Sequence, residues 1–571
     1  MDLWAAISRL PSKIERNFIE TVSITLQIST TVCIIEKILF KGGFQKSMLF
    51  QTKKIAAVLC GVFLAGALSA QTLYPANGAT DAAYDAQLVL TFQADPELVP
   101  GSFITIYDAS GAVADQIAFT DDEQIFSDGK TVAVGSQLVR KEGKSVYVQP
   151  HYGKLSPSTQ YSVEVPADAI KAEGFNGVAK GAWSFSTKAA PAAVSDGATL
   201  TVNNSTDASN NAQFHSIQGA LSFVEKNEGT YTISLAPATY YELLHYNGTA
   251  NIILQGPKDN KRGDNTIIKY INCNDMNPKQ DTRVVFLFTG ANLTLENLTM
   301  INATDPRKVY ISTQKVASGN AQAETLFFYK GKGHTLTVYN CSFKSLQDTM
   351  QISGKCWFYN CYVEGDVDYV WGTAEVALFE ECDFHSVYSP LSGKDRAYIF
   401  ETRVGEEGQP LINKGYVLYN SRVQVDMRQN AYYGRRATAV EKAKVPYYDQ
   451  SAIVNVEFWG EGNIGDMRWY VGKAPRVVDG SKHVGWKEYN VSFKKITGKK
   501  PSDTSKRYKD AGDLDKKTYK AEYSNRDVIM NRVYNIEKGV YEDDTLAPWD
   551  VNQVARDRGY KVKDLPKAKK K

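Results

Sequence analysis

Short runs in which apolar and polar residues alternate recur along most of the chain. Between residues 72 and 189 these runs include AAYDAQLVLTFQ, SFITIYDASG, KSVYVQP, TQYSVEVP and AWSFSTK, separated by Gly, Pro, Asp and Ser. Alternation with a period of two is typical of strands that bury one face, and closely spaced short strands favour a sandwich. We therefore predict a small β-sandwich over residues 72–189, followed by the Pro/Ala-rich linker AAPAAVSDGA.

A repeating strand pattern follows the linker. The segments LTLENLTM, LTVYNCSF, CWFYNCYV, ALFEECDF and YVLYNSRV align with one another. Their matched positions are Asn297, Asn340, Asn360, Glu381 and Asn420. Consecutive matches are separated by about 20 residues or about twice that, which corresponds to one or two turns of a repeating unit. A strand that returns at a fixed period, with little helical periodicity between repeats, predicts a right-handed parallel β-helix.

The cysteines fit this repeat better than a disulfide framework. Cys341, Cys361 and Cys382 fall on equivalent positions of successive coils, where we predict a ladder of small buried side chains without a redox role. Cys356 and Cys361 bracket a predicted strand, so their Cα atoms would lie about 16 Å apart at about 3.3 Å per residue. A disulfide needs a Cα separation of about 5.5 Å, which excludes that pair.

The N-terminus has the three-part pattern of a secretory signal. From Met48, two lysines precede an apolar run that closes on small residues at Ala70. The run is too short for a stable membrane span, so we expect an exported protein that is periplasmic, at the cell surface or secreted. Residues 1–47 fit no targeting scheme, and we interpret Met48 as the true start. Residues 1–70 are therefore expected to be an upstream extension plus a signal peptide.

Composition limits the partners and the metals. A length of 571 residues favours two or three domains, and a net charge of +3 gives no reason to expect nucleic-acid binding. With six histidines and no CxxC spacing, no zinc site is predicted. Residues 491–571 are expected to form a Lys-rich C-terminal extension, and its end KVKDLPKAKKK is interpreted as a solvated tail.

Two aspartates interrupt the strand-like run YNCYVEGDVDYVWG. Acidic residues are depleted in strands, so one of the two has a special role or both face solvent. Asp348 precedes Asp368 by one period of the repeat, which predicts that the two lie on neighbouring coils. Gln322 lies further back by about one more coil with a loop. We interpret the other aspartate of the run, Asp366, as a surface residue.

Five short motifs in this region, in matching order and spacing, resemble those of the pectinesterase family. LQDTM and GDVDYVWG are similar to its QDT and GxVDFIFG motifs, and ATYYE, AQAETL and YGRRA are similar to GTYxE, QAVAL and LGRPW. The resemblance covers about residues 195–490 and implies a pectinesterase-like β-helix there. The front domain, by its LYPANGAT and WSFSTK ends, resembles bacterial Ig-like domains found beside extracellular enzymes.

The resemblance implies an active site. Asp368 would be the nucleophile, Asp348 the general acid and then base, and Arg435 the residue that orients Asp368. Gln322 and Gln347 would polarise the developing oxyanion. A guanidinium keeps a neighbouring carboxylate ionised for attack on an ester, whereas a second carboxyl group nearby stays protonated for the leaving group. This chemistry requires neither a metal nor an organic cofactor.

The resemblance also implies substrate contacts from Trp371, Tyr369 and Arg436. In YGRRA the Pro and Trp of the family motif are replaced, so a substrate-stacking tryptophan is missing. The candidates to substitute for it are Trp459, Tyr432 and Tyr433. The arginine doublet leaves the orienting residue open, because a slip of one position would choose Arg436 in place of Arg435. The insertion KVYISTQKVASGN before Gln322 predicts an extended loop near the groove.

These features together imply an exported, monomeric carbohydrate esterase that releases methanol from methylated pectin. The enzymatic alternatives are a polygalacturonase, whose G-H-G signature is absent, and a pectate lyase, for which no cluster of calcium-ligating carboxylates is visible. A further alternative is an inactive β-helix that binds carbohydrate. Binding alone would not require both Asp348 and Asp368.

Overall fold

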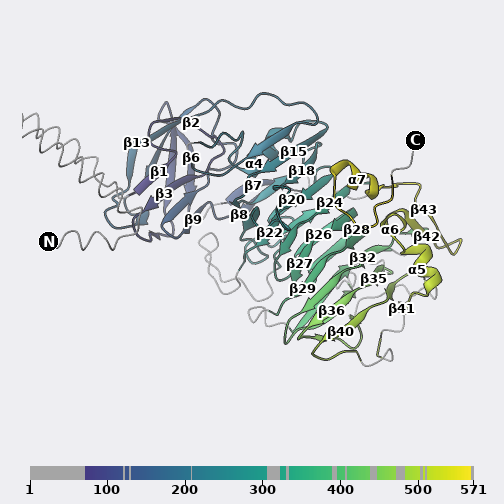
Figure 1. The fold of residues 1–571 in the computed structure, drawn as a ribbon. Helices are drawn as coiled ribbons and strands as arrows, with labels where there is room; N and C mark the ends of the chain where they lie inside the picture. The colour runs from purple at the N-terminus through teal and green to yellow at the C-terminus, as the bar shows by residue number, and fades with distance from the viewer. Residues whose placement is uncertain are drawn as a thin grey trace, which may run out of the picture. The chain divides into compact units, whose positions relative to one another are not determined.

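Two kinds of β-structure follow one another along the chain (Figure 1). The computed structural model describes residues 71–119, 122–127, 130–207, 209–304, 322–328, 333–388, 395–405, 408–436, 447–470, 483–501, 506–507 and 511–567. The predicted signal segment and the predicted loop at residues 308–320 lie outside the described residues.

The front part is a two-sheet sandwich with an apolar centre. One sheet has the order β1 (Gln71–Tyr74), β3 (Leu88–Phe92), β10 (Ser145–Val148) and β9 (Val139–Glu142). The other has the order β2 (Ala79–Ala82), β13 (Val178–Thr187), β11 (Gln160–Val165), β5 (Phe103–Asp108) and β6 (Val113–Ala118). One short pair, β4 (Glu97–Leu98) with β12 (Ile170–Lys171), completes it. The hairpin of β7 (Asp122–Ser127) and β8 (Lys130–Gly135) packs instead on the second part, where Val134 is buried in its core. Alternate residues such as Leu90, Val163 and Trp183 are fully buried, as the period-two pattern predicts.

The second part is built from parallel strands that repeat coil after coil. The longer sheet runs through β14 (Thr199–Val202), β15 (Thr230–Leu235), β17 (Leu244–Tyr246), β18 (Asn251–Gln255), β20 (Phe286–Phe288), β21 (Leu293–Glu296), β23 (Leu326–Phe328), β24 (Thr335–Tyr339), β26 (Met350–Tyr359), β28 (Val370–Glu380), β30 (Arg396–Thr402), β32 (Gly415–Tyr419), β34 (Asn430–Arg436), β35 (Ser451–Val454), β37 (Asn463–Ile464), β38 (Trp469–Tyr470), β39 (Trp486–Tyr489) and β41 (Gly512–Asp513).

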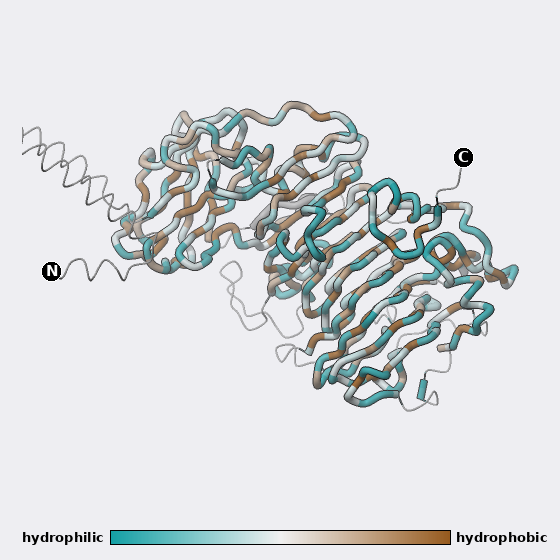
Figure 2. The backbone as a smooth tube through the Cα atoms, in the orientation of Figure 1, coloured by the Kyte–Doolittle hydropathy of each residue, from teal (hydrophilic) through white to brown (hydrophobic). Residues whose placement is uncertain are grey.

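A second parallel sheet closes the coils. It consists of β16 (Thr239–Tyr241), β19 (Ile267–Tyr270), β22 (Thr299–Asn302), β25 (Ser342–Lys344), β27 (Tyr362–Gly365), β29 (Asp383–Ser386), β33 (Arg422–Val425), β36 (Glu457–Gly460) and β40 (Ser492–Ile496). Hydropathy changes repeatedly along each of these strands, which places apolar residues inside the coil (Figure 2). This arrangement confirms the predicted all-β class, a parallel β-helix preceded by a sandwich.

The register of the strands shows how the repeat accommodates insertions. Glu296 pairs with Tyr339, and Glu380 pairs with Tyr419. The two long gaps in the repeat, which precede Asn340 and Asn420, are therefore each a single coil with a long insertion, and neither contains two turns. An insertion at a coil corner lengthens a surface loop without disturbing the strands, because loops tolerate added length at small entropic cost.

The matched polar positions of the repeat form one corner of the β-helix. Asn297, Asn340, Asn360, Glu381 and Asn420 all have left-handed backbones, with φ between 50° and 56°. Two later residues, Asn455 and Asn490, continue the series. The amide of Asn340 donates to Asn297 Oδ1 (2.8 Å), and that of Asn360 donates to Asn340 Oδ1 (3.0 Å). Asparagine suits this corner because it tolerates positive φ and hydrogen-bonds locally. We call the six asparagines of this series the asparagine ladder.

The cysteine ladder is confirmed as a packing feature. Cys341, Cys361 and Cys382 are buried free thiols, as are Cys273 and Cys356. The backbone N–H of Cys361 donates to the sulfur of Cys382 (3.4 Å), which shows how closely successive coils approach. Burial raises the pKa of the Cys382 thiol well above its ordinary value, so this thiol stays protonated.

A short helix closes the N-terminal end of the β-helix. The ATYYE glutamate, Glu242, accepts hydrogen bonds from the backbone N–H groups of Ile217 and Gln218 (3.0 Å each) at the start of α4 (Ile217–Val224). Burial raises the pKa of Glu242 to about 7, although the two N–H donors oppose the shift. The motif residue therefore has a structural role here, because it satisfies helix donors that have no partner within the helix.

The C-terminal extension packs against the β-helix. Residues 511–567, the C-terminal cap, contain α5 (Lys516–Glu522), α6 (Arg526–Asn531) and α7 (Val551–Arg558). The hairpin β42 (Arg532–Asn535) and β43 (Val540–Asp543) pairs with β31 (Leu411–Ile412). The cap buries an outward-facing apolar row of the longer sheet that includes Trp357, Leu378 and Val417.

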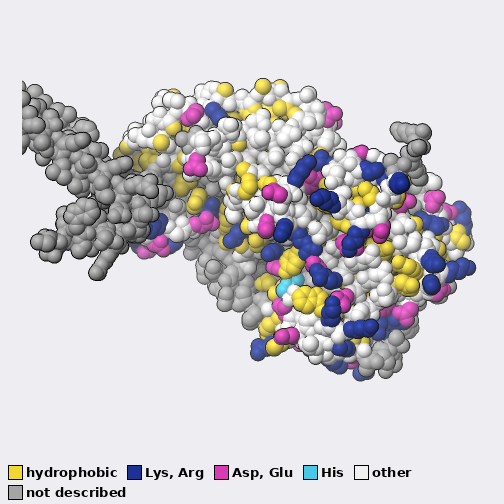
Figure 3. Space-filling model, in the orientation of Figure 1, with side chains coloured by type: hydrophobic (Ala, Val, Ile, Leu, Met, Phe, Trp, Pro, Cys, Tyr) yellow, Lys and Arg dark blue, Asp and Glu magenta, His cyan; other side chains and the backbone are white. Residues whose placement is uncertain are grey.

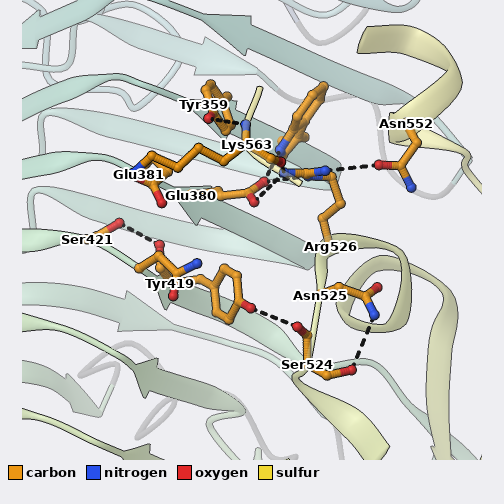
Figure 4. A network of polar contacts seen from close by, with 12 residues as sticks. Tyr359, Glu380, Glu381, Tyr419, Ser421, Ser524, Asn525, Arg526, Asn552 and Lys563 are labelled. Carbon is orange, nitrogen blue, oxygen red and sulfur yellow. Dashed lines mark hydrogen bonds and ion pairs between the residues drawn. The ribbon is translucent and has the colours of Figure 1, made fainter. Parts of the chain in front are cut away.

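Buried polar contacts fix the cap in place (Figure 4). Arg526 donates to both carboxylate oxygens of Glu380 (2.9 and 2.8 Å), and the backbone N–H of Lys563 donates to the hydroxyl of Tyr359 (2.8 Å). The interpretation of residues 561–571 as a solvated tail is therefore wrong for its first residues, which lie against the sheet. Basic and acidic side chains are interspersed over the visible face, in keeping with the small net charge (Figure 3). No helix among the described residues is long and apolar enough to cross a membrane.

Candidate active site

Asp348 and Asp368 occupy equivalent turns of neighbouring coils, just before β26 and β28. Gln347 bridges to Val367, and the N–H of Asp348 donates to the carbonyl oxygen of Val367 (2.9 Å). Both aspartates have left-handed backbones, with φ of 61° and 50°. A non-glycine residue in this region costs about 1–3 kcal/mol unless its surroundings hold it there. The coil-to-coil hydrogen bonds supply that support and fix the two carboxyl groups one coil apart.

Asp368 is clamped by an arginine from β34. Arg435 Nε donates to Asp368 Oδ1 (2.7 Å), and Arg435 Nη2 donates to Oδ2 of the same carboxylate. The pair is side-on and bidentate, which is the strongest geometry for an arginine and a carboxylate. Burial lowers the pKa of Arg435, but the Asp368 charge outweighs this and raises it, so the guanidinium stays charged. Of the two neighbouring arginines, it is Arg435 that contacts Asp368.

Asp348 has a different environment. Its Oδ2 atom accepts hydrogen bonds from the amide of Gln322 (2.6 Å) and from Arg283 (3.3 Å). Its Oδ1 atom has no hydrogen-bond partner among the described residues. Burial raises the pKa of Asp348 well above its ordinary value, and the charges of Glu324 and Asp368 add to the shift while Arg283 opposes it. The surroundings of Asp348 therefore favour its protonated form, whereas Asp368 is paired with a guanidinium.

The two glutamines lie on the same edge of successive coils. Gln322 bridges to Gln347, and Gln347 in turn bridges to Val367, so the three backbones form a short parallel stack beside the aspartates. Both side chains are half-buried. The structure thus brings together Asp368, Arg435, Asp348 and the two glutamines, the residues that the resemblance grouped.

Two charged residues of this site were missed by sequence reasoning. Arg283 precedes β20, and its side chain contacts Gln322, Asp348 and the fully buried Glu324. The signal that could have found this pair is in AQAETL, where Glu324 stands at the place of Val in QAVAL. A carboxylate at a buried apolar position requires a cation nearby. Among the described residues, no group of three or more His, Cys, Asp or Glu could hold a metal ion.

Trp371 and Tyr369 are both buried. Trp371 lies on β28 in register with Gln351 and Glu401 of the flanking coils, and the guanidinium of Arg403 lies 5.2 Å from its ring centre. Tyr369 points into the coil, where its hydroxyl pairs with Ser386 (2.9 Å). A ring inside the coil offers no face to a sugar, so the position of Tyr369 fits packing and does not support the implied substrate contact.

Arg436 and Asp366 also lie in the interior. The side chain of Arg436 is 3.6 Å from buried Asp449, whereas that of Arg435 lies on Asp368. The interpretation of Asp366 as a surface residue is wrong, because it is fully buried and its N–H donates to the carbonyl oxygen of Leu346 (2.6 Å). It lies in the tight turn between β27 and Asp368, which carries its side chain away from solvent.

Three tyrosines stand beside Arg435. Tyr432 on β34 lies 5.5 Å, centre to centre, from both Tyr398 on β30 and Tyr470 on β38, and Arg435 lies over the ring of Tyr398 (5.6 Å). Of the candidates to replace the missing tryptophan, Tyr432 is therefore next to the site. Tyr433 is fully buried, and Trp459, 37% exposed, lies on β36 in the other sheet.

Comparison with known proteins finds two families along the chain. Residues 203–442 match the pectinesterase family, and residues 65–187 match the bacterial Ig-like domain family. The chain contains a pectinesterase domain. It follows an N-terminal Ig-like domain, as the sequence motifs predict, and its family is one of carboxylic ester hydrolases.

Similarity to individual pectinesterases is partial. Pectinesterase B of Dickeya dadantii is 29% identical over 28% of this chain and 34% of its own length. Probable pectinesterase 49 of Arabidopsis thaliana is 24% identical over 44% of this chain and 63% of its own length. The chain thus spans between a third and two thirds of these two relatives. Pectin methylesterase PemA of Erwinia chrysanthemi has 19% identity and a TM-score of 0.42, with 59% of this chain and 98% of PemA covered.

Proposed function

We propose that the pectinesterase domain hydrolyses methyl esters of pectin and releases methanol and demethylated pectin. The observation that carries the proposal is the pair of unlike carboxyl groups one coil apart. Asp368 is paired side-on with the Arg435 guanidinium, and Asp348 is buried, hydrogen-bonded by Gln322 and has a raised pKa that favours its protonated form. Two titratable groups whose environments push their protonation states apart are the usual sign of divided acid and nucleophile roles.

The first half-reaction uses the ionised carboxylate. An oxygen of Asp368 attacks the carbonyl carbon of the methyl ester, and the carbonyl oxygen becomes an oxyanion. The amide N–H groups of Gln322 and Gln347 stabilise this charge, and one such donor contributes about 3 kcal/mol where it has been tested. The bond to the methoxy oxygen then breaks, and that oxygen takes the proton of Asp348. Methanol leaves, and an anhydride joins Asp368 to the uronate.

The second half-reaction reverses the role of Asp348. As a carboxylate it now accepts a proton from water, while the water oxygen attacks the uronate carbonyl of the anhydride. The bond to Asp368 breaks, and Asp368 returns as a carboxylate to Arg435. Asp348 ends protonated, so both groups regain their starting states and no other reactant is consumed.

The surface beside the carboxyl groups suits a uronic acid polymer. Tyr432 and Tyr470 are half-buried aromatic rings next to Arg435, and sugars stack on such rings. Arg396 is exposed, donates to the hydroxyl of Tyr470 (3.3 Å) and offers a cation to a neighbouring carboxylate. We propose that this aromatic group replaces the tryptophan that YGRRA lacks.

Action on a plant cell-wall polymer requires that the protein leave the cytoplasm. We propose that residues 48–70 direct export and are removed after Ala70. The charge and hydropathy pattern of this segment supports the proposal. N-terminal sequencing of the protein secreted or released from the periplasm tests it, and a mature start at Gln71 is expected.

Incubation of the protein with highly methylated pectin tests the proposed reaction. Methanol release, chain length and unsaturated ends are measured in the same samples. We expect methanol without a change in chain length. Chain shortening would indicate a glycosidase, and unsaturated ends would indicate a lyase. Folded protein that releases no methanol from pectins of several methylation patterns would refute the esterase.

A further inference from the structure

The guanidinium of Arg283 uses every donor it has. Its Nε atom donates to both carboxylate oxygens of Glu324 (3.0 and 2.9 Å), and its Nη2 atom donates to Glu324 Oε1 (2.7 Å) and Asp348 Oδ2 (3.3 Å). Its Nη1 atom donates to Gln322 Oε1 (2.6 Å) and Asn274 Oδ1 (3.1 Å). The side chain is 4% exposed and that of Glu324 is 0% exposed. A fully satisfied, buried guanidinium has one orientation available to it.

This orientation determines which way the amide of Gln322 points. A guanidinium only donates, so the amide must present its oxygen to Arg283. The amide nitrogen of Gln322 is thereby turned to Asp348, to which it donates at 2.6 Å. Without the cation, the amide oxygen loses its donor, and the side chain is free to turn away from the carboxyl group. Arg283 therefore controls the direction of a donor in the site although its own side chain is buried.

Glu324 is the reason that the arginine stays in place. It replaces the apolar residue of the family motif QAVAL with a carboxylate inside the coil. A single buried charge is strongly destabilising, whereas a hydrogen-bonded pair is tolerated. Arg283 and Glu324 thus form one unit, in which each group compensates the buried charge of the other.

We propose that Arg283, held by Glu324, is a positioning residue for the esterase reaction proposed above. It directs the Gln322 amide toward Asp348 and sets the balance of charge around that acid. The inference rests on the proposed function for its catalytic meaning, but the geometry of Gln322 can be tested without turnover.

The charges that face Asp348 predict in which direction its pKa changes when Arg283 or Glu324 is replaced. Glu324, Asp368 and Glu401 are acidic neighbours that favour its protonated form, and Arg283 favours the ionised form. Arg435 also interacts with it from the far side of Asp368. Loss of Arg283 therefore raises the pKa of Asp348 further, and loss of the Glu324 charge lowers it. Because the first half-reaction needs protonated Asp348, the alkaline limb of kcat/KM follows that pKa.

The test compares pH profiles of kcat/KM for methanol release. Arg283→Met should move the alkaline limb of the profile to higher pH, by about one pH unit or more, and Glu324→Gln should move it to lower pH. We also expect Arg283→Met to lower kcat about 100-fold, since a misdirected donor near the reacting atoms has an effect of this size. The double variant Arg283→Met/Glu324→Val removes both charges and should place the limb between those of the single variants.

A matched control separates positioning from folding. Arg526 and Glu380 form another buried, bidentate pair, between the C-terminal cap and β28. Arg526→Met should lower the temperature of unfolding without moving the alkaline limb. If the Arg283 and Glu324 variants likewise lose stability with an unmoved limb, or shift it in the same direction, the proposal is overturned.

A crystal structure of the double variant tests the geometry independently of activity. The Gln322 side chain is expected to leave Asp348 once its oxygen has no donor. An unchanged Gln322–Asp348 contact would overturn the positioning role even if the pH profiles differed. If the wild-type protein releases no methanol, only the proposed function is refuted. The position of the Gln322 side chain in the crystal structure of the double variant would still decide whether Arg283 directs that side chain.

Discussion

Two corners of the same β-helix use the same backbone conformation for opposite purposes. The asparagine ladder and the aspartates Asp348 and Asp368 all have φ between 50° and 61°. In the ladder, each inner amide is paired: Asn340 donates to Asn297 and Asn260 and accepts from Arg262 and Asn360. At the aspartate corner, Asp348 keeps an oxygen without a partner among the described residues, and other acidic side chains lie close to it.

The difference shows how a repeat can acquire chemistry. A left-handed corner holds its side chain at a fixed place on every coil, because the coils above and below determine the backbone. When the residue is Asn, the fixed side chains satisfy one another and the corner is structural. When it is Asp, the two carboxyl groups cannot satisfy one another, and Asp348 keeps an oxygen that is available to a substrate. Function here arises from the side chain at a common backbone position.

The strongest test of the comparison converts the reactive corner to a ladder residue. Asp368→Asn keeps a side chain that tolerates positive φ and can still accept from Arg435. It removes the nucleophilic charge, and methanol release should fall about 10⁴-fold or more, because loss of a nucleophile has effects of this order. The temperature of unfolding should change little. A variant that keeps a tenth of the wild-type rate would contradict the nucleophile assignment.

Asp348→Asn sharpens the comparison by removing the acid instead. We expect kcat/KM to fall about 10²- to 10⁴-fold, the usual contribution of general acid–base catalysis. In the wild type, kcat/KM should decline as pH rises through the elevated pKa of Asp348, because the acid form is lost. The variant has no such acid, so its remaining activity should lack that decline. A persistent alkaline limb at the same pH would assign it to another group.

The reverse experiment removes an asparagine from the ladder and tests its contribution to stability. Asn340→Ala removes the four hydrogen bonds of that amide and leaves a β-carbon at φ 56°, so the free energy of unfolding should fall by about 1–3 kcal/mol. Methanol release per folded molecule should be unchanged. Asn340→Gly, which has no strain at positive φ, separates the two causes. Asn490, at the exposed end of the ladder, is the control, and Asn490→Ala should cost less than Asn340→Ala.

The smallest expected effect concerns the surface beside the aspartate corner. Tyr432→Ala should raise KM about 3- to 10-fold with little change in kcat, because an aromatic contact contributes about 0.5–1.5 kcal/mol. Tyr432→Phe keeps the ring and should behave as wild type. An equal loss for both variants would show that the hydroxyl acts in place of the ring face.

The sequence predicts the features that repeat or that are local. The spacing of Asn297, Asn340 and Asn360 predicts a chain that returns coil after coil. The separation of Asp348 and Asp368 by one period predicts that they lie on adjacent coils. Arg283 could not be found this way, since an arginine before a strand has no periodic signal and Gln322 and Asp348 lie 39 and 65 residues away from it. The burial of Asp366 was missed for a related reason, because the tight turn before Asp368 ends the strand alternation.

The helices, the hairpin and the contacts of the C-terminal cap could not be predicted, because its partners in the chain are more distant still. The hydroxyl of Tyr560 donates to Glu296, 264 residues earlier, and Arg558 binds the same carboxylate. Outward-facing Trp357 and Leu378 alternate with the residues that point into the coil, so both faces of the strand are apolar. Such a run is consistent with any fully buried strand and does not reveal what covers it.

The cap also sets the order in which the molecule can be completed. Synthesis proceeds from the N-terminus, so the strands through β40 are made before any residue of the cap exists. Until then Trp357 and Leu378 remain an uncovered apolar strip on the growing solenoid, open to association with other chains. The cap therefore closes an apolar surface that was laid down much earlier in synthesis.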